Sequence, residues 1–388
     1  MILELADILE QTFAERASLQ CNVPGPNPSF LVGNLGSVIF QKQHIGLLAN
    51  KWYKKFRTLP YVGYYKVFKP AIMVNDTELV KNILINDFGS FYSNDISGSD
   101  DPQDIGSGNP FTQQDEQKWK TGRAAMASLF SASKLTGHTL GSFVDGYETS
   151  STSMSFAMWH LARNPDIQER LYEDISEVLQ KHGNEFSYEA INEMEYLNMV
   201  MQETMRLNTI ILSMHRKCRK PYTLPQLPGQ EKPFVIQPGT PVLIPVYAIH
   251  HDPEFYPDPY VFNPLRFTEE ERKNRPRCAY LPFGEGPRLC VGKNLGVMQF
   301  KFGIASIIKN FKILESPNCK PVEIDPRSPL LLQTVNRLLE ISSAAKIDRL
   351  KRLIMGKSPW MKSAKASRCL SEDSQDCVHH LVQQSVYS

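Results

Sequence analysis

The chain has 388 residues, of which 41% are hydrophobic, and its 43 basic and 41 acidic side chains leave a formal charge of +2. This length is ample for a large hydrophobic core. The near-neutral charge gives no overall indication of nucleic-acid binding. Seven cysteines, scattered and odd in number, exclude a simple disulfide framework and favour a reducing, cytosol-facing environment.

The first 21 residues are predicted to form a short amphipathic segment rather than a membrane anchor. Glu4, Asp7 and Glu10 interrupt its apolar residues, and no stretch of the chain approaches the ~18 consecutive apolar residues that a spanning helix needs. The start of the sequence also lacks the basic region and apolar run of a secretory signal. Any membrane association is therefore expected to be peripheral.

Turn and strand signals dominate the next part of the chain. Proline, glycine and asparagine at 22–35 predict an ordered turn, and the aromatic and β-branched stretch 61–74 predicts a β-hairpin. A short helix capped by Asp76 should follow the hairpin. Residues 94–109 are polar and rich in glycine, which indicates a loop.

Helical patterns fill most of the region from 114 to 207. The stretches 114–135, 143–161 and 165–179 are each expected to be helical. Apolar residues at helical spacing in 187–207 predict a helix with one buried face, made of Ile191, Met194, Leu197, Val200 and Met201.

The remainder of the chain is irregular except for one helix. Prolines and short β-like runs at 221–247 precede a long meander at 248–289, which is dense in proline, aromatic residues and charge. A helix is predicted at 291–311, directly after Cys290. Residues 342–388 are rich in serine and in basic side chains, which predicts a solvated, disordered tail.

The sequence FGEGPRLCVG at 283–292 places one cysteine in a loop that allows close backbone approach. A cysteine just ahead of a helix lies where free N–H groups and the positive end of the helix dipole favour a thiolate. Gly286 and Gly292 let the backbone come close to a flat or bulky group, and Arg288 adds a permanent cation. The pattern suits a thiolate that binds a buried metal cofactor bearing carboxylates.

The residues of this loop leave three other interpretations open. A lone cysteine is often a small core residue. A glycine-rich loop before a helix can bind phosphate, although this one has no Lys-Ser/Thr ending and no clear preceding parallel strand. A zinc site could combine Cys278 and Cys290 with His250 and His251, but no closely spaced pair of ligands exists.

The loop resembles F-x-x-G-x-R-x-C-x-G, the haem-binding signature of the haem-thiolate monooxygenases, which form the cytochrome P-450 superfamily. Further resemblances occur in the family's order, at the motifs VPGPNP (hinge), WKTGR (W-x-x-x-R), DGYETS (oxygen groove), ETMR (E-x-x-R) and FNPLRF (meander). The likeness covers roughly residues 20–335 and is to animal microsomal, insect detoxification-type members. It implies a mainly α fold with a small β-rich lobe.

The resemblance also implies roles for individual residues. Cys290 would be the axial thiolate ligand of haem b (iron protoporphyrin IX), with Phe283 packed near its sulfur. Glu148 and Thr149 would organise water and deliver protons to bound O2, although a helix-interior threonine can also simply bond its own backbone. The cofactor's propionates would lie near Trp119 and pair with Arg123, Arg216 and Arg288. The loop would rest on a structural triad of Glu203, Arg206 and Arg266.

Three features depart from the family's pattern. Asp145 stands in the oxygen-groove motif where a small residue is usual. Only 26 residues separate Arg123 from Thr149, so the helices that roof the substrate pocket should be missing. The membrane anchor is absent, and the chain leaves the pattern again near Glu340. The predicted organisation is therefore an N-terminal segment, one truncated haem-thiolate domain and a tail, at 1–21, 22–341 and 342–388.

Two functional hypotheses follow from the resemblance and its departures. The first is a monooxygenase that inserts one oxygen atom of O2 into lipophilic small molecules such as xenobiotics, insecticides, hormones or lipids. Electrons would come from NADPH through NADPH–cytochrome reductase, with cytochrome b5 as a further partner, at the cytosolic face of the endoplasmic reticulum (microsomal) membrane. The second is a truncated, non-catalytic isoform with weak or no haem binding. In either case the missing roof should expose Phe143, Phe156 and Met158 on the central helix.

Overall fold

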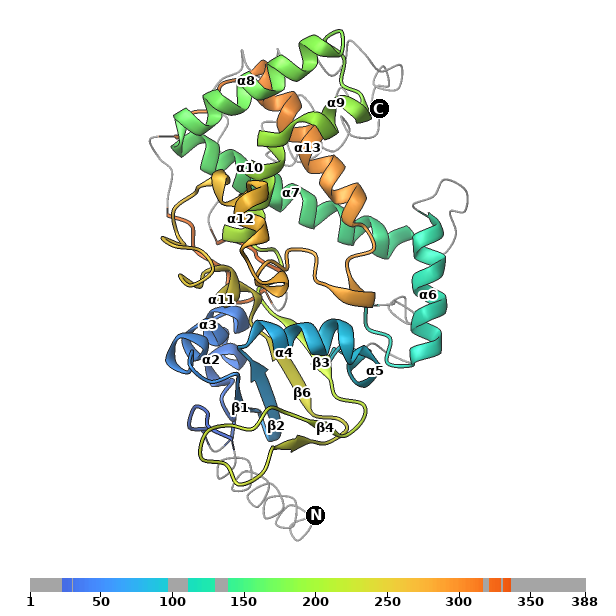
Figure 1. Cartoon of the computed structure of the whole chain (residues 1–388), viewed down its shortest axis with the longest axis vertical. Helices are drawn as coiled ribbons and strands as arrows, with labels where there is room; N and C mark the ends of the chain where they lie inside the picture. Colours follow the sequence, from blue (N-terminus) through green and yellow to red (C-terminus); the bar gives the residue numbers. More distant parts are fainter. Residues whose placement is uncertain are drawn as a thin grey trace.

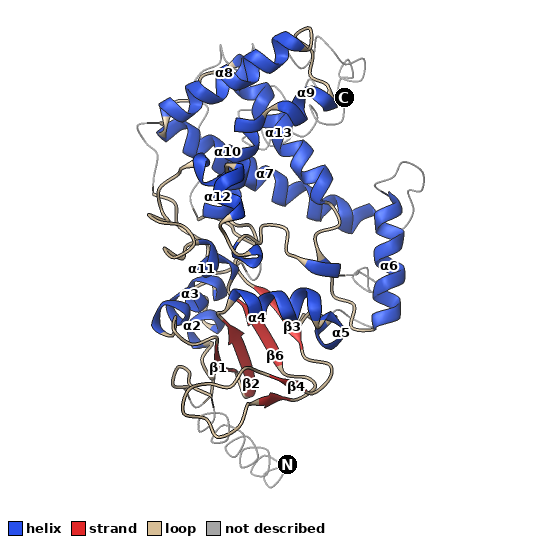
Figure 2. Ribbon diagram, in the orientation of Figure 1, coloured by secondary structure: helices blue, strands red, loops and turns tan. Residues whose placement is uncertain are grey.

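The structure is a computed structural model that describes residues 23–29, 31–96, 111–129, 139–316, 321–328 and 331–335. A helical lobe and a smaller β-rich lobe make up most of it, and α6 (Glu116–Leu129) stands to one side, between them (Figure 1). Figure 2 shows that the strands are confined to the smaller lobe. The mainly α fold with a small β-rich lobe is thereby confirmed. The predicted segments 1–21 and 342–388 lie outside the described residues.

The helical lobe is built around α7 (Thr139–Arg163). Around it lie α8 (Pro165–Lys181), α9 (Tyr188–Glu193), α10 (Glu195–Leu207) and α13 (Lys293–Asn310). Their shared core includes the fully buried Leu161, Leu197 and Phe300. Gly303 lets α13 approach α7 closely, because a Cβ atom at this position would lie 2.6 Å from the sulfur of Met154.

The smaller lobe contains a four-stranded sheet with the order β1 (Tyr61–Lys66), β2 (Lys69–Val74), β6 (Pro241–Ile244) and β3 (Met214–Lys217). Strands β1 and β2 form the predicted antiparallel hairpin, in which Tyr61 faces Val74. Strand β6 pairs parallel with β2 and antiparallel with β3. A separate two-stranded sheet contains β4 (Tyr222–Thr223) and β5 (Val235–Ile236).

Short helices border this sheet: α2 (Gly36–Ile39), α3 (Ile45–Lys55), α4 (Thr77–Lys81), α5 (Phe88–Phe91) and α11 (Val246–His250). The predicted cap of α4 is present, because the Asp76 carboxylate accepts a 2.7 Å hydrogen bond from the Leu79 N–H. The helix then continues as a π-helical turn, η1 (Asn82–Asn86). The meander after α11 contains η2 (Pro264–Phe267), α12 (Glu269–Lys273), η3 (Arg277–Ala279) and η4 (Gly286–Arg288).

Two predicted helices differ in their limits. The 187–207 helix breaks at Met194, which lies between α9 and α10, although all five residues of its predicted apolar face are buried. The helix after the cysteine begins at Lys293, with Gly292 as its N-cap, and not directly after Cys290. Cys290 therefore lies in the loop, two residues before this cap.

The connection between α6 and α7 is short, because only residues 130–138 separate the two helices. Nine residues cannot form the several helices that the family pattern places here, in agreement with the predicted gap. None of the described helices combines the length and hydrophobicity needed to cross a membrane. The side chains of Asp145 and Phe143 lie outside the described residues.

The predicted exposure of Phe156 is wrong. Its side chain is fully buried against Leu212 and Leu332, and Met158 is partly buried on the helical core. The cover over Phe156 comes from the segment 321–335, where the Leu332 N–H donates a 2.6 Å hydrogen bond to the Ile210 carbonyl. Leu332, which is far from α7 along the chain, thus covers an apolar residue that was expected to face the missing helices.

Candidate functional site

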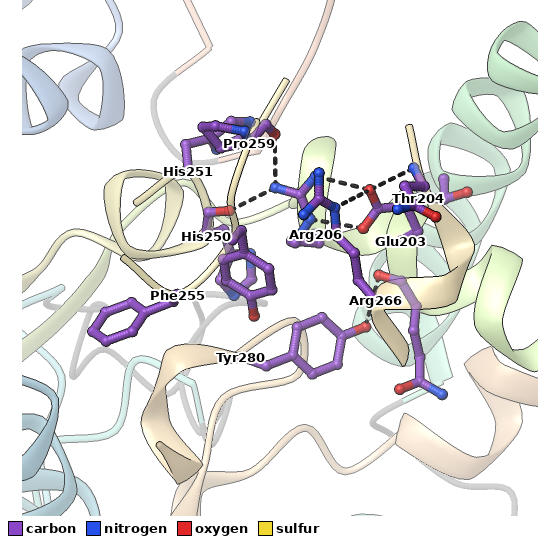
Figure 3. A network of polar contacts seen from close by, with 12 residues as sticks. Glu203, Thr204, Arg206, His250, His251, Phe255, Pro259, Arg266 and Tyr280 are labelled. Carbon is purple, nitrogen blue, oxygen red and sulfur yellow. Dashed lines mark hydrogen bonds and ion pairs between the residues drawn. The ribbon is translucent and has the colours of Figure 1, made fainter. Parts of the chain in front are cut away.

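A buried ion pair lies at the end of α10, below the loop that carries Cys290. The Arg206 guanidinium donates to both carboxylate oxygens of Glu203, at 2.7 and 2.9 Å, and both side chains are fully buried (Figure 3). Arg206 also donates to the backbone carbonyls of His250 and Pro259, at 2.7 and 2.8 Å. Such dense hydrogen bonding is what makes a buried ion pair tolerable.

Arg266 joins this pair less tightly than predicted. Its Nε lies 3.5 Å from Glu203 Oε1, within range of an ion pair, but it makes no aligned hydrogen bond. That oxygen already accepts from Arg206 and from the Asn263 N–H. Burial lowers the pKa of Arg266, while the charge of Glu203 acts in the opposite direction. The triad is thus assembled, with Arg206 held by hydrogen bonds and Arg266 mainly by charge.

The chain just before the cysteine loop is fixed by three hydrogen bonds from buried side chains. Tyr256 donates to the Ala279 carbonyl at 2.9 Å, and Tyr280 donates to the Gln202 carbonyl at 3.0 Å. The ring of His250 accepts from the Leu281 N–H at 2.8 Å. These bonds connect residues 279–281 to α10, α11 and the meander.

Within the loop, the Cys290 N–H donates to the Phe283 carbonyl at 2.9 Å and the thiol of Cys290 is exposed. Phe283 packs against the helical core. Gly286 has φ +74°, and a Cβ atom there would lie 1.9 Å from the carbonyl oxygen of Leu84. A glycine is therefore required at position 286, but by the close approach of the chain at Leu84 and not by a bound group. A Cβ atom at Gly292 would meet no described atom within 4 Å.

Three arginines gather beside this loop. Arg216, only 5% exposed, donates to the Asn94 side chain at 2.7 Å, and its buried Nε has no hydrogen-bond partner among the described residues. Arg123 donates to the Leu289 carbonyl at 2.5 Å. Arg288 donates to the backbone carbonyls of Tyr92 and Gln113 and lies 4.7 Å from the ring of buried Trp119.

Electrostatics show that these arginines share one environment. Burial lowers the pKa of Arg288 to about 9, with further lowering by the charges of Arg216 and Arg123. Burial alone lowers the pKa of Arg216 to about 10. The pKa of Arg123 is also lowered by burial, and the nearby Cys290 opposes that shift. One buried and two half-buried cations that repel one another beside a cysteine form a site that favours an anion.

The arrangement fits a haem. Its two propionates would supply the negative charge that this cluster favours, and the orphan Nε of Arg216 would gain an acceptor. The exposed sulfur of Cys290 would be the side-chain group that holds the haem iron. The neutral hydrogen-bond partners of the cluster given above do not by themselves balance its charge.

The residues predicted to handle protons lie on α7, where both are half-buried. The side chain of Gln333 lies 3.4 Å from Glu148 Oε1, in a long and exposed hydrogen bond. The backbone carbonyl of Thr149 accepts from Ser153 at 2.9 Å. Next to them, Ser150 donates to Gln299 at 2.8 Å and so ties α7 to α13.

The zinc hypothesis gains no support. Within the described ranges, no group of three or more His, Cys, Asp and Glu side chains could hold a metal ion. Burial raises the pKa of the Cys278 thiol to about 11, which opposes the thiolate that zinc would need.

Two residues of this region were missed by sequence reasoning. Asn94, which orients Arg216, lies at the start of a polar stretch with no recognisable pattern. His250 was considered only as a possible metal ligand, whereas the structure gives its ring a bond to the cysteine loop.

The fold and the cationic cysteine loop have the features of haem-thiolate proteins. The sequence model of the family described as Cytochrome P450 matches residues 126–341, which is more than half of the chain. The chain belongs to the cytochrome P450 family, as its motifs indicated.

Fruit-fly proteins show where the similarity is concentrated. The chain is 45% identical to "Cytochrome P450 6a8" of Drosophila melanogaster over 192 residues, which are 49% of this chain and 37% of the relative. It is 44% identical to "Probable cytochrome P450 6a18" over 191 residues (49% and 37%). A third, "Probable cytochrome P450 6a13", is 39% identical over 211 residues (54% and 42%). The chain thus spans less than half the length of these curated relatives.

Proposed function

We propose that this chain binds haem b through Cys290 and descends from monooxygenases that act on lipophilic small molecules. The observation that carries the proposal is the cluster of buried Arg216 and half-buried Arg123 and Arg288 beside an exposed cysteine. A bound dicarboxylate would relieve the repulsion among these cations. A flat dicarboxylate that also carries a metal ion could both pair with the arginines and bind the cysteine thiolate.

Each residue near the loop would have a defined task in holding the group. Cys290 would ligate the iron through its sulfur, and Arg216 would donate its unused Nε–H to a propionate. Trp119 keeps Arg288 in place by stacking at 4.7 Å. Phe283, packed on the helical core, would keep water from the sulfur. The Gly292 backbone leaves open space on its Cβ side, where a ring edge could lie.

When bound, the haem would supply oxygen activation and one-electron chemistry. The chain's own contribution would be protons and their control. Glu148 would hold a proton at its carboxyl group and Thr149 at Oγ1, and both would pass it to water close to the iron. The bond from Gln333 would limit the rotation of Glu148.

Partners and location follow from the family and form part of the proposal. Electrons would come from NADPH through NADPH–cytochrome reductase, with cytochrome b5 as a second donor. The protein would work at the cytosolic face of the endoplasmic reticulum and would contact the membrane peripherally. The substrates would be lipophilic compounds such as xenobiotics, insecticides, hormones or lipids.

A second candidate function is a truncated, non-catalytic isoform with weak or no haem binding. It is favoured by the short connection 130–138, which leaves no chain for helices above the oxygen side of α7. Without such cover, water would reach the cofactor, and reduced oxygen species would escape before they met a substrate.

The haem proposal can be tested on the purified full chain loaded with haem. The reduced, carbon monoxide-bound protein should show the absorption band typical of thiolate ligation. Cys290→Ser should abolish that band, whereas Cys278→Ala, at a buried cysteine of the same segment, should keep it. Loss of the band in both variants, or in Cys278→Ala alone, would contradict the assignment of Cys290.

Turnover separates the two candidates. The loaded chain would be combined with a reductase and NADPH, and both oxidised product and hydrogen peroxide would be followed. Product formation on the order of 1 per second would establish the enzyme. NADPH consumption that yields peroxide without product would establish the isoform that binds haem but does not turn over.

A further inference from the structure

His250 connects the buried ion pair to the cysteine loop. It ends α11, is fully buried, and its carbonyl accepts a 2.7 Å hydrogen bond from Arg206. Its ring accepts a 2.8 Å hydrogen bond from the Leu281 N–H through Nε2 and stacks on Tyr280, with 5.5 Å between ring centroids. Figure 3 shows the histidine between Arg206 and Tyr280. One residue thus contacts the ion pair through its backbone and the loop through its side chain.

The hydrogen bonding of His250 fixes its chemical form. Because Nε2 accepts from an N–H group, a neutral ring must carry its proton on Nδ1. Burial first, and then the nearby His251 and Arg206, hold the pKa of His250 well below its ordinary value, so the ring is neutral. Nδ1 is buried without a hydrogen-bond partner among the described residues. An unsatisfied buried N–H is unfavourable. The tautomer that lets Nε2 accept from Leu281 therefore carries an energetic penalty at Nδ1.

A continuous series of hydrogen bonds runs from this acceptor to the cysteine. Leu281, held at its N–H by His250, accepts at its carbonyl from the Gly284 N–H at 3.1 Å. The residue between them in the turn, Phe283, accepts from the Cys290 N–H at 2.9 Å. The turn 281–284 is therefore the base on which the cysteine backbone is placed.

We propose that His250 is a positioning residue for Cys290: its Nε2 acceptor fixes Leu281 and thereby sets the place of the cysteine sulfur. The geometry assigns to this side chain the link between the Glu203–Arg206 pair and the loop. The positioning of the loop is a property of the chain alone, while its consequence for haem ligation rests on the function proposed above.

Four variants isolate the acceptor. His250→Phe keeps a stacked ring but removes Nε2, and His250→Gln places an amide oxygen near the same position. His250→Asn carries the same amide but is too short to reach Leu281. His251→Phe is the matched control, because His251 is also buried and neutral but bonds the Tyr247 carbonyl instead of the loop.

The first readout is hydrogen exchange of the amides in 281–290 in the haem-free full chain. Loss of the acceptor in His250→Phe should speed this exchange on the order of tenfold. The second is the fraction of loaded protein that shows the thiolate-type band when reduced and bound to carbon monoxide. That fraction should fall in His250→Phe and His250→Asn and be restored in His250→Gln, with His251→Phe unchanged.

Several results would overturn the proposal. The proposal fails if His250→Phe shows the wild-type rate of amide exchange in 281–290 and the wild-type fraction of thiolate-type band. It also fails if His251→Phe loses as much of that band as His250→Phe. If His250→Phe gives no folded protein, the glutamine and asparagine variants decide, and equal behaviour of the two contradicts a role for the acceptor. A wild-type chain without a thiolate-type band would sink the haem assignment alone, because the exchange measurement still decides whether His250 holds the loop.

Discussion

The chain that leads to the Cys290 loop is held by more and shorter hydrogen bonds than the oxygen side of α7. At the first, Tyr256, Tyr280 and His250 fix the chain before the loop through hydrogen bonds of 2.8–3.0 Å. The Glu203–Arg206 pair, bonded at 2.7 Å, lies at the end of α10. On the second, Glu148 has one exposed contact at 3.4 Å, and nine residues replace what should be a roof. The residues before the cysteine loop are therefore held by many short contacts, whereas Glu148 on α7 has one long contact.

This difference shows how the two tasks depend on the chain. Holding a planar dianion with a thiolate would require a preorganised set of charges. Arg123, Arg216 and Arg288 gather that positive charge, and nearby hydrogen bonds fix the chain before the loop. Shielding requires bulk over the opposite face. In this chain that bulk is partly supplied by the segment 321–335, which buries Phe156. On the proposed function, haem binding would therefore tolerate a reduced cover of α7.

The largest expected effect is a loss of stability when the buried ion pair near the cysteine loop is broken. Arg206→Ala leaves the buried Glu203 with only the unaligned 3.5 Å contact to Arg266 as an ion pair among the described residues. Removal of one partner from a buried pair typically costs ~3–5 kcal/mol. Urea unfolding of the haem-free chain should show this loss of stability. Lys181→Ala, which removes an exposed pair with Glu177, is the control and should leave the unfolding midpoint in place. An Arg206→Ala protein as stable as wild type would show that the pair does not carry the fold.

A smaller effect tests whether the segment 321–335 really covers α7. Leu332 is 2% exposed and packs on Phe156 and Leu212. Leu332→Ala should therefore lower the free energy of unfolding by about 2 kcal/mol, at the lower end of the range for leucine truncations. Leu314→Ala, at a leucine that is 68% exposed, should change it by less than about 0.5 kcal/mol. Equal effects would mean that Leu332 does not cover the helix in solution.

The two loop glycines separate chain packing from cofactor binding. Gly286→Ala should destabilise the haem-free chain by ~1–3 kcal/mol, because of its positive φ and its contact with the Leu84 carbonyl. Gly292→Ala should leave haem-free stability unchanged but slow or weaken haem uptake. Thermal unfolding and haem titration measure the two properties. If Gly292→Ala bound haem normally, the ring would not lie against this backbone.

The smallest expected effect is on pH dependence. Burial lowers the pKa of His251 to about 3 and that of His160 to about 4. Below the ordinary histidine pKa of about 6.5 the unfolded chain takes up protons that the folded chain refuses, so stability is full above that pH and falls as pH drops. Each such histidine contributes up to about 1.4 kcal/mol per pH unit. Replacing His251 by Phe should make the acid slope shallower by one proton, and an unchanged slope would mean that His251 is protonated in the fold.

Local patterns in the sequence predicted the helices, the hairpin and the cysteine loop with useful accuracy. The periodic face of 187–207, the cap at Asp76 and the strands of 61–74 depend on neighbouring residues, and all are present. The break at Met194 and the start of α13 at Lys293 depend on packing and were not predicted. The burial of Phe156 was missed for the same reason, because its cover comes from residues more than 150 positions away.

The sequence by itself determined the family and the cysteine that would bind the cofactor, because these depend on residue types at short, fixed spacing. Only the tertiary structure decided which charges gather beside that cysteine. It brought Arg216 from a strand and Arg123 from a helix to Arg288 beside Cys290, and it placed the His250 ring under Leu281. Such contacts join elements that are distant along the chain, and their strength depends on how deeply the folded chain buries them. No local pattern of residues encodes them.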